Sequence, residues 1–240
     1  PFWSDEFDQE GPPDPKRWTF DLGGHGWGNQ ELQYYTARPE NARIQGGKLI
    51  LQARKEDYQG RAYTSARLVT KDRCDLVYGK VVVRAKLPKG RGSWPAIWML
   101  ASQHEFGKDY WPDNGEIDIM EHVGFDAGKI HASIHSKAFN HIAKTQKTAQ
   151  IVIKDACEAF HDYSLEWTPK EIRVAVDDNI YFEFKNPGQS WQEWPFDEPF
   201  HLLLNVAVGG FWGGMQGVDE SIWPQQMEID FVRLYHYREK

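Results

Sequence analysis

The chain has 240 residues with a formal net charge of −7, and hydrophobic residues make up 40% of it. An acidic chain without a basic run is a poor candidate for binding nucleic acid or an anionic membrane surface. No stretch of about eighteen apolar residues is present, so we expect no membrane-spanning helix. All-β sandwiches often form one domain at this length, and no repeat or linker divides the chain, so we expect a single domain over residues 1–240.

Short β-rich or alternating runs, separated by turn residues, dominate the sequence. In chain order these expected strands lie at residues 46–55, 65–70, 79–88, 117–123, 129–136, 161–169, 171–184, 199–210 and 227–237. The run 171–184 is expected to be a hairpin that turns around Asp178 and Asn179. Residues 148–162 are the best helix candidate, and they suit a strand followed by a loop equally well. Many short strands at this spacing favour a β-sandwich.

Three carboxylates fall close together in the segment NGEIDIMEHV, residues 114–123. On a strand Glu116 and Asp118 share one face, while the isoleucines beside them point into the core. Strict alternation would bury Glu121, and an unpaired buried carboxylate is costly. A β-bulge at Ile119–Met120 would return Glu121 to the face of the other two acids, and bulges are common beside active sites.

Carboxylates that share one face repel one another, and they persist only if they share protons or bind a cation. A metal site is one interpretation, but the segment lacks the loop and carbonyl ligands that Ca²⁺ favours. A solvated acidic strand is another. The third interpretation is acid/base chemistry, in which one carboxylate attacks and another, its pKa raised by its neighbours, donates a proton as in glycoside hydrolysis. We favour this third interpretation.

The segment GEIDIMEHVG resembles the active-site signature of glycoside hydrolase family 16, E-[IL]-D-x-x-E. The segments WSDEFD, GWGNQELQYYT, YGKVVVRAKLPKGRGSWPAIWML, LLLNVAVGG and MEIDFVRLY are similar, in the same order, to segments of the family's laminarinase-type endo-β-1,3-glucanases. The resemblance implies an all-β fold, a jelly-roll β-sandwich of two antiparallel curved sheets with a concave substrate cleft. It also implies retaining endo-hydrolysis of β-1,3-glucans, with no cofactor for catalysis.

Several alternatives stay open within this resemblance. The chain could act on mixed-linkage β-glucan or an algal galactan, or it could bind β-1,3-glucan without cleaving it. The bulged D-x-x-E form and the segment GWGNQELQYY favour β-1,3-glucan as the polysaccharide partner.

The resemblance also implies roles for individual residues. Glu116 matches the nucleophile, Glu121 the general acid/base and Asp118 the assisting carboxylate. Eight further residues are expected to bind substrate: Trp27, Asn29, Arg67, Trp94, Trp98, His135, Asn205 and Trp212. From the residues alone, Trp98 could instead belong to the core and Arg67 could instead form a structural salt bridge. His131 and His135 lie four apart, but no third ligand for a zinc site is apparent.

A structural Ca²⁺ away from the cleft is a further implication of the resemblance. Its expected ligands are Glu6, the backbone of Gly46 or Gly47, and Asp230, all of them oxygen donors. The alternative role for Asp230 is a salt bridge.

The two cysteines, Cys74 and Cys157, are too few for a disulfide framework, and we expect free thiols. The chain begins without Met, so we expect a secreted, periplasmic or cell-surface protein whose targeting segment has been removed. We expect a monomer.

Overall fold

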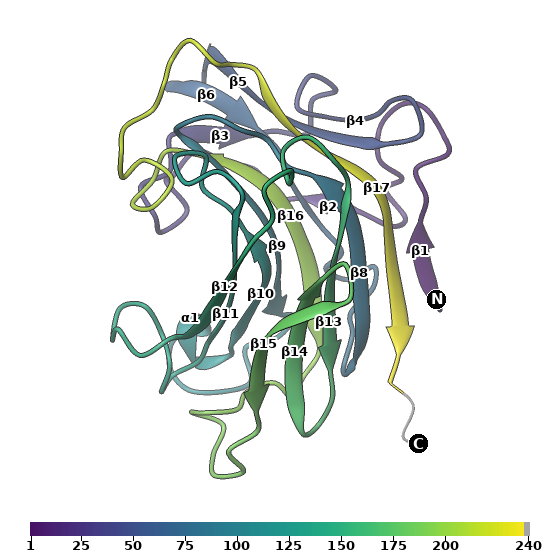
Figure 1. Ribbon diagram of the computed structural model, residues 1–240, viewed down its shortest axis with the longest axis vertical. Helices are drawn as coiled ribbons and strands as arrows, with labels where there is room; N and C mark the ends of the chain where they lie inside the picture. Colours follow the sequence, from purple (N-terminus) through teal and green to yellow (C-terminus); the bar gives the residue numbers. More distant parts are fainter. Residues whose placement is uncertain (238–240) are drawn as a thin grey trace.

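A computed structural model describes residues 1–237, whose strands form two curved sheets packed face to face (Figure 1). The larger sheet contains β1 (Trp3–Asp5), β3 (Gln33–Tyr35), β4 (Ala42–Ile44), β5 (Leu49–Tyr58), β6 (Arg61–Ser65), β8 (Gly79–Lys86), β13 (His161–Trp167), β14 (Glu171–Val176), β15 (Asn179–Lys185) and β17 (Gln225–His236). The smaller sheet contains β2 (Thr19–Phe20), β7 (Arg67–Val69), β9 (Ser93–Ala101), β10 (Glu116–Glu121), β11 (Lys129–His135), β12 (Lys147–Val152) and β16 (Phe200–Val208).

The order of strands puts the acidic segment in the middle of the smaller sheet. That sheet runs β12-β11-β10-β9-β16-β7-β2, and the larger one runs β15-β14-β13-β8-β17-β5-β6-β3 with β1 beside β17 and β4 beside β5. The pairs are antiparallel, and among the described residues β3 and β6 are the parallel exception to the expected antiparallel sheets. The expected two-sheet sandwich is therefore confirmed.

The core lies between the two sheets. Buried and partly exposed residues alternate along β8, with Val81 and Val83 turned inward. Every residue of β16 is buried, and Leu202 and Leu204 belong to the core. Full burial of one such side chain stabilises the fold by about 1.5–3 kcal/mol. This packing holds the smaller sheet rigid as the base of the site.

Two local predictions need correction. Residues 148–162 form no helix: they contain most of β12, then turns, then the start of β13. The hairpin between β14 and β15 turns at Asp177 and Asp178, one residue earlier than expected, and both have positive φ angles of 49° and 66°. The one helix of the described chain is the single turn α1 (Tyr110–Asp113). Over residues 1–237 no helix is long and apolar enough to cross a membrane.

Candidate active site

Strand β10 carries the bulge that the spacing of its acids predicts. Asp118 pairs with Trp98 of β9, and Met120 pairs with the adjacent Ile97. Ile119 has no partner on β9, so it is the extra residue of the bulge. Ile119 and Met120 both point into the core and are fully buried. Glu121 therefore returns to the same face as Glu116, and the predicted bulge is confirmed.

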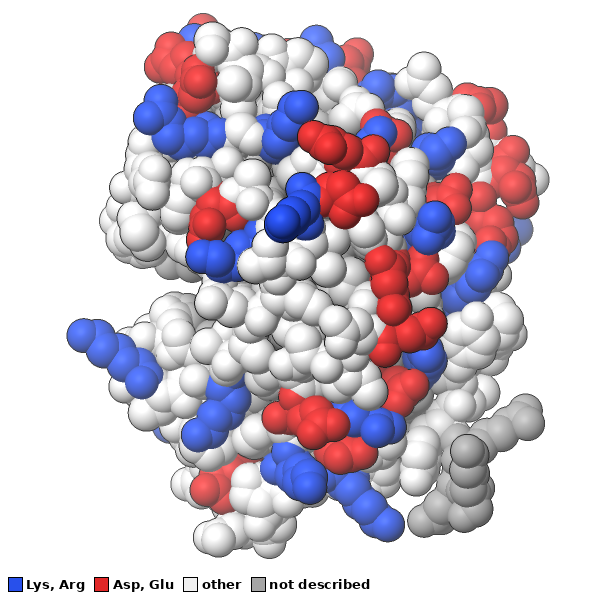
Figure 2. All heavy atoms as spheres, viewed as in Figure 1, with Lys and Arg blue, Asp and Glu red and all other residues white. Residues whose placement is uncertain are grey.

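A notch opens beside this strand on the molecular surface. In Figure 2 the outline is hollowed on the left, and in the same view Figure 1 places α1 below this level and the loop that follows β16 above it. In Figure 1 the strands of the smaller sheet run along the right side of this notch, so side chains on the outer face of β9, β10, β11 and β16 line it. The acidic strand thus faces a cleft, as expected.

Glu116 is held on the α1 side of the cleft. The indole nitrogen Nε1 of Trp111 donates a hydrogen bond of 2.7 Å to Glu116 Oε2. The Trp111 ring lies 4.9 Å from the ring of His141 and 5.9 Å from that of His135. Sequence reasoning missed Trp111, and its position five residues before Glu116 gives no strand periodicity that would reveal it.

Asp118 follows Glu116 on the same face of β10 and is 1% exposed. Burial raises the pKa of Asp118 well above its usual value, and the charges of Glu116 and Glu121 raise it further. Asp118 Oδ2 lies 3.3 Å from His135 Nε2, and burial lowers the pKa of His135. Burial therefore favours a neutral carboxyl beside a neutral imidazole over an ion pair, and the neighbouring Glu116 carboxylate favours the protonated form of Asp118 as well.

Glu121 lies toward the opposite side of the cleft from Trp111. Burial raises the pKa of Glu121 to about 8, the negative charge of Glu116 adds to this shift, and a hydrogen bond from Trp94 opposes it. That bond, from Trp94 Nε1 to Glu121 Oε1, measures 3.1 Å. With a pKa of about 8, Glu121 is about nine-tenths protonated at pH 7. It can therefore donate a proton at neutral pH.

Aromatic rings and one arginine form the floor next to β10. Trp98 is partly exposed, and its Nε1 donates a 2.7 Å hydrogen bond to Asn205 Oδ1. The guanidinium carbon of Arg67 lies 4.7 Å from the ring centroids of both Trp27 and Trp98. Arg67 Nε is also 2.9 Å from Asp21 Oδ2. Arg67 thus forms the salt bridge that was its alternative role, and it also lies in the cleft wall. Trp98 does not belong to the core.

The remaining predicted residues lie around the rim. Trp212 is partly exposed, and its ring lies 5.6 Å from that of Trp94 and 4.9 Å from that of His131. Asn29 donates a 3.2 Å hydrogen bond to the buried carboxylate of Glu31. The structure therefore gathers the predicted substrate-binding residues around one cleft, with Trp111 beside Glu116 and the buried Glu31 behind Asn29.

One group of side chains could hold a metal ion. Ligand atoms of Glu116, Asp118 and His135 all lie within 4.8 Å of one another. Two carboxylates and an imidazole suit a transition metal such as Zn²⁺ better than Ca²⁺, which prefers oxygen ligands alone. Two of these residues, Glu116 and Asp118, are the ones that the resemblance assigns to catalysis, and the third, His135, is one that it assigns to substrate binding.

The predicted calcium ligands have other partners in the structure. Glu6 forms two hydrogen bonds with Arg233, of 3.0 and 2.8 Å. Asp230 lies 3.5 Å from Arg84, which is the salt-bridge alternative for that residue. The loop of Gly46 and Gly47 meets a different carboxylate, because Gly46 N donates a hydrogen bond of 2.6 Å to Glu10 Oε1. The proposed calcium set therefore stays a prediction.

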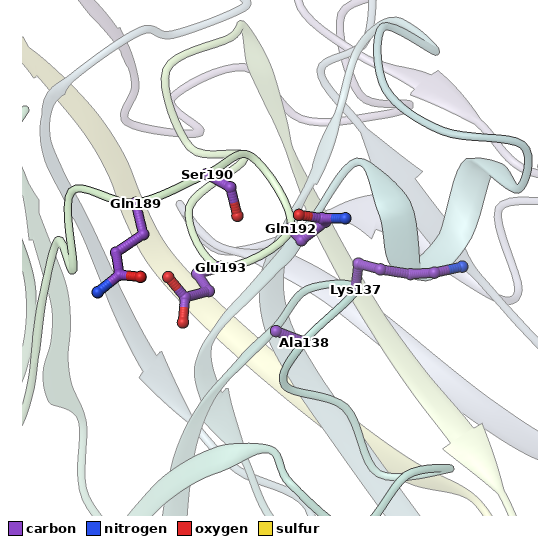
Figure 3. Close-up of a pocket in the computed structure, with 6 residues that line it drawn as sticks. All are labelled: Lys137, Ala138, Gln189, Ser190, Gln192 and Glu193. Atoms are coloured by element: carbon purple, nitrogen blue, oxygen red, sulfur yellow. The ribbon is translucent and has the colours of Figure 1, made fainter.

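The cysteines are free, as expected: Cys74 is buried and Cys157 is partly buried. Figure 3 shows a separate open depression of about 480 Å³. It is lined by Lys137, Ala138, Gln189, Ser190, Gln192 and Glu193. None of these residues belongs to the predicted site.

Comparison with known proteins agrees with this geometry. The family "Glycosyl hydrolases family 16" matches residues 29–233. A "Beta-glucanase" of Rhodothermus marinus is 57% identical over 99% of this chain and 85% of its own length. The X-ray structure of the laminarinase from Rhodothermus marinus has a TM-score of 0.97 at 56% identity, covering 99% of this chain and 97% of that one.

A third similar protein carries a bound oligosaccharide. It is a mutant of SCLam, a non-specific endo-β-1,3(4)-glucanase co-crystallized with 1,3-β-D-cellotriosyl-glucose. Its TM-score is 0.93 at 47% identity, and the match covers 98% of this chain and 93% of that one. A family match over most of the chain, together with relatives of this similarity, identifies the protein: it belongs to glycosyl hydrolases family 16.

Proposed function

We propose that the protein hydrolyses internal β-1,3-glucosidic bonds of laminarin-type β-glucans with net retention of anomeric configuration. The observation that carries this proposal is the pairing of two carboxyl groups on one bulged strand. Glu116 accepts a hydrogen bond at the α1 side of the cleft, and Glu121 has its pKa raised to about 8 on the other side. Retaining glycosidases use such a pair, one residue as nucleophile and the other as acid.

In the first step Glu116 attacks the anomeric carbon and Glu121 gives its proton to the leaving oxygen. The bond to the leaving group breaks as the bond to the Glu116 carboxylate forms, so a glycosyl ester results. Trp111 holds Glu116 through its hydrogen bond, and Asp118, whose protonated form Glu116 favours, lies beside it on the same strand face.

The second step reverses the role of Glu121. Esterification removes the negative charge of Glu116, which is one cause of the raised pKa of Glu121. The pKa of Glu121 therefore falls in the intermediate, and the ionised carboxylate takes a proton from the attacking water. Water releases the sugar from Glu116 on the face that the leaving group occupied, so the configuration is retained.

The linkage preference rests on the bulged signature and on similarity to laminarinases. A mixed-linkage β-glucan is the second candidate substrate, because SCLam is described as non-specific for β-1,3(4)-glucan. An algal galactan is the remaining substrate alternative. The presence of both Glu116 and Glu121 opposes a protein that only binds glucan.

Side-by-side hydrolysis of laminarin, barley mixed-linkage glucan and agarose tests this assignment. We expect laminarin to shorten first, with early loss of average chain length well before glucose accumulates. Barley glucan should be cut more slowly. Faster cleavage of agarose than of laminarin would contradict the substrate assignment.

Further proposals concern the setting of the enzyme. We propose a secreted, periplasmic or cell-surface protein, because a long polysaccharide must reach an open cleft, and we propose that it is a monomer. We also propose that a Ca²⁺ ion joins the chain ends through Glu6, the backbone of Gly46 or Gly47, and Asp230, all of which offer oxygen ligands. This requires Glu6 and Asp230 to leave their arginine partners.

A further inference from the structure

A buried carboxylate lies behind the cleft and takes no part in the two chemical steps. Glu31 is 6% exposed. Its Oε1 accepts a hydrogen bond of 3.2 Å from Asn29, and its Oε2 accepts one of 2.6 Å from Gln33 and one of 3.3 Å from the hydroxyl of Tyr35. A buried carboxylate is costly unless its oxygens are satisfied in this way. Here three donors satisfy the two oxygens, and the cost that remains is the loss of hydration on burial.

The hydrogen bonds continue from Glu31 to the floor of the cleft. Asn205 Nδ2 donates a bond of 3.0 Å to the Tyr35 hydroxyl. Asn205 Oδ1 in turn accepts the 2.7 Å bond from the indole of Trp98. Tyr35 and Asn205 are both buried, so water does not compete for these contacts. Trp98 is thus joined to Glu31 through two intervening side chains.

The two ends of this series fix its direction. The indole N–H of Trp98 can only donate, and an ionised carboxylate can only accept. Asn205 and Tyr35 can each donate or accept the hydrogen bond that joins them, because an amide and a hydroxyl both donate and accept. With an acceptor at Glu31, the Tyr35 hydroxyl donates to it and leaves a lone pair for the Asn205 amide. The oxygen of Asn205 is then directed at Trp98.

We propose that Glu31 is a positioning residue for substrate binding, which holds Asn29 at the rim through one oxygen and the Trp98 ring through the other. This inference rests on the proposed function, since both residues are expected to contact the sugar chain. A fixed indole and a fixed amide bind sugar without first losing side-chain freedom, which favours affinity. We call the series Trp98, Asn205, Tyr35 and Glu31 the Glu31 relay.

The energetics of Glu31 separate this role from a scaffolding role. Burial raises the pKa of Glu31 above its usual value, even though its three hydrogen bonds and the charge of Arg67 act in the opposite direction. A carboxyl whose pKa is raised in the folded state destabilises the fold when it is ionised. Glu31→Gln should therefore keep the melting temperature or raise it, while it weakens binding. Such an exchange of stability for function is typical of binding and active sites.

Two substitutions interrupt the Glu31 relay at different points. In Glu31→Gln the neutral amide offers one oxygen and one NH₂ group, so it cannot accept all three hydrogen bonds, and either Asn29 or the pair Gln33 and Tyr35 must turn away from it. Tyr35→Phe removes the hydroxyl that joins Asn205 to Glu31 and keeps the ring. Tyr163→Phe is the matched control, because Tyr163 is equally buried and its hydroxyl has no hydrogen-bond partner.

Steady-state kinetics on laminarin give the first readout. We expect KM to rise about ten-fold in both relay variants, as loss of a hydrogen bond to a charged group predicts, with kcat changed by no more than about three-fold. The double variant should show about the same KM as the stronger single variant, because both changes disable one series. Tyr163→Phe should match the wild type.

The indole proton of Trp98 gives a second readout that needs no turnover. Its ¹H–¹⁵N resonance, assigned by its loss in Trp98→Phe, should shift in both relay variants and stay in place in Tyr163→Phe. The inference is wrong if Tyr35→Phe changes neither KM nor this resonance, as expected for the control Tyr163→Phe. It is also wrong if KM rises only in variants whose melting temperature falls. If the wild type does not cleave laminarin, the proposed function fails, and the resonance still decides on the Glu31 relay.

Discussion

The hydrogen bond from Trp94 to Glu121 should set the alkaline limit of activity. In the wild type the pKa of Glu121 is about 8, and the acid form is needed in the first step. Raising the pH from 7 to 9 should therefore lower the first-step rate about ten-fold. Trp94→Phe removes a donor that favours the ionised form, so the pKa of Glu121 should rise. A hydrogen bond to a charged group contributes about 1.5–3 kcal/mol, and solvent around a partly exposed side chain reduces this contribution. The alkaline limit of activity should therefore move about one pH unit higher.

The assay is the pH profile of kcat/KM on laminarin between pH 5 and pH 10. Trp98→Phe is the control, because its indole bonds to Asn205 and not to a carboxylate. That variant should lose activity without moving the alkaline limit. A wild-type limit below pH 6, or a limit that Trp94→Phe leaves in place, would refute the reasoning about Glu121.

Four further predictions follow from the site and the fold. Glu116→Ser should fold and bind oligosaccharide but lose turnover, and residual activity above a few per cent of wild type, measured with purified protein, would remove Glu116 from the nucleophile role. Glu121→Ala should be crippled on laminarin yet active on aryl glycosides with good leaving groups, which need no proton; equal losses on both substrates would contradict the acid role. EDTA should lower the melting temperature if Ca²⁺ joins Glu6 to Asp230, and an unchanged melting curve with no metal in the purified protein would end that proposal. Leu204→Ala, in the core strand β16, should lower the free energy of unfolding in urea by about 2–5 kcal/mol, whereas a change below about 1 kcal/mol would mean that the sheets pack loosely there.

The sandwich could be predicted because its strands follow local rules. Apolar and polar residues alternate over 79–88, which predicts a strand with one face toward the core. The structure has this strand as β8 at Gly79–Lys86, with alternating burial. The bulge was predictable for a similar reason, since Glu121 is out of phase with Glu116 and a buried acid is costly. Periodicity and burial energy therefore account for the strand that carries the acids.

Other features depend on contacts between distant segments. Trp111 reaches Glu116 from the α1 turn, and Tyr35 meets Asn205 from another sheet, so no sequence period reveals either contact. Residues 148–162 were ambiguous because β12 lies at the edge of its sheet and buries little of its apolar pattern. The carboxylates of Glu6 and Asp230 could be named as oxygen ligands from the resemblance, but their arginine partners appear only in the fold.

The anomeric configuration of the first products tests the central claim most directly. Laminarin should be digested in an NMR tube with enough enzyme that hydrolysis is faster than mutarotation. The anomeric protons should be followed from the first minute. Attack by Glu116 followed by water predicts β-anomers first, with α-anomers appearing only as mutarotation proceeds. Initial α-anomers would contradict the double displacement, and with it the roles proposed for Glu116 and Glu121.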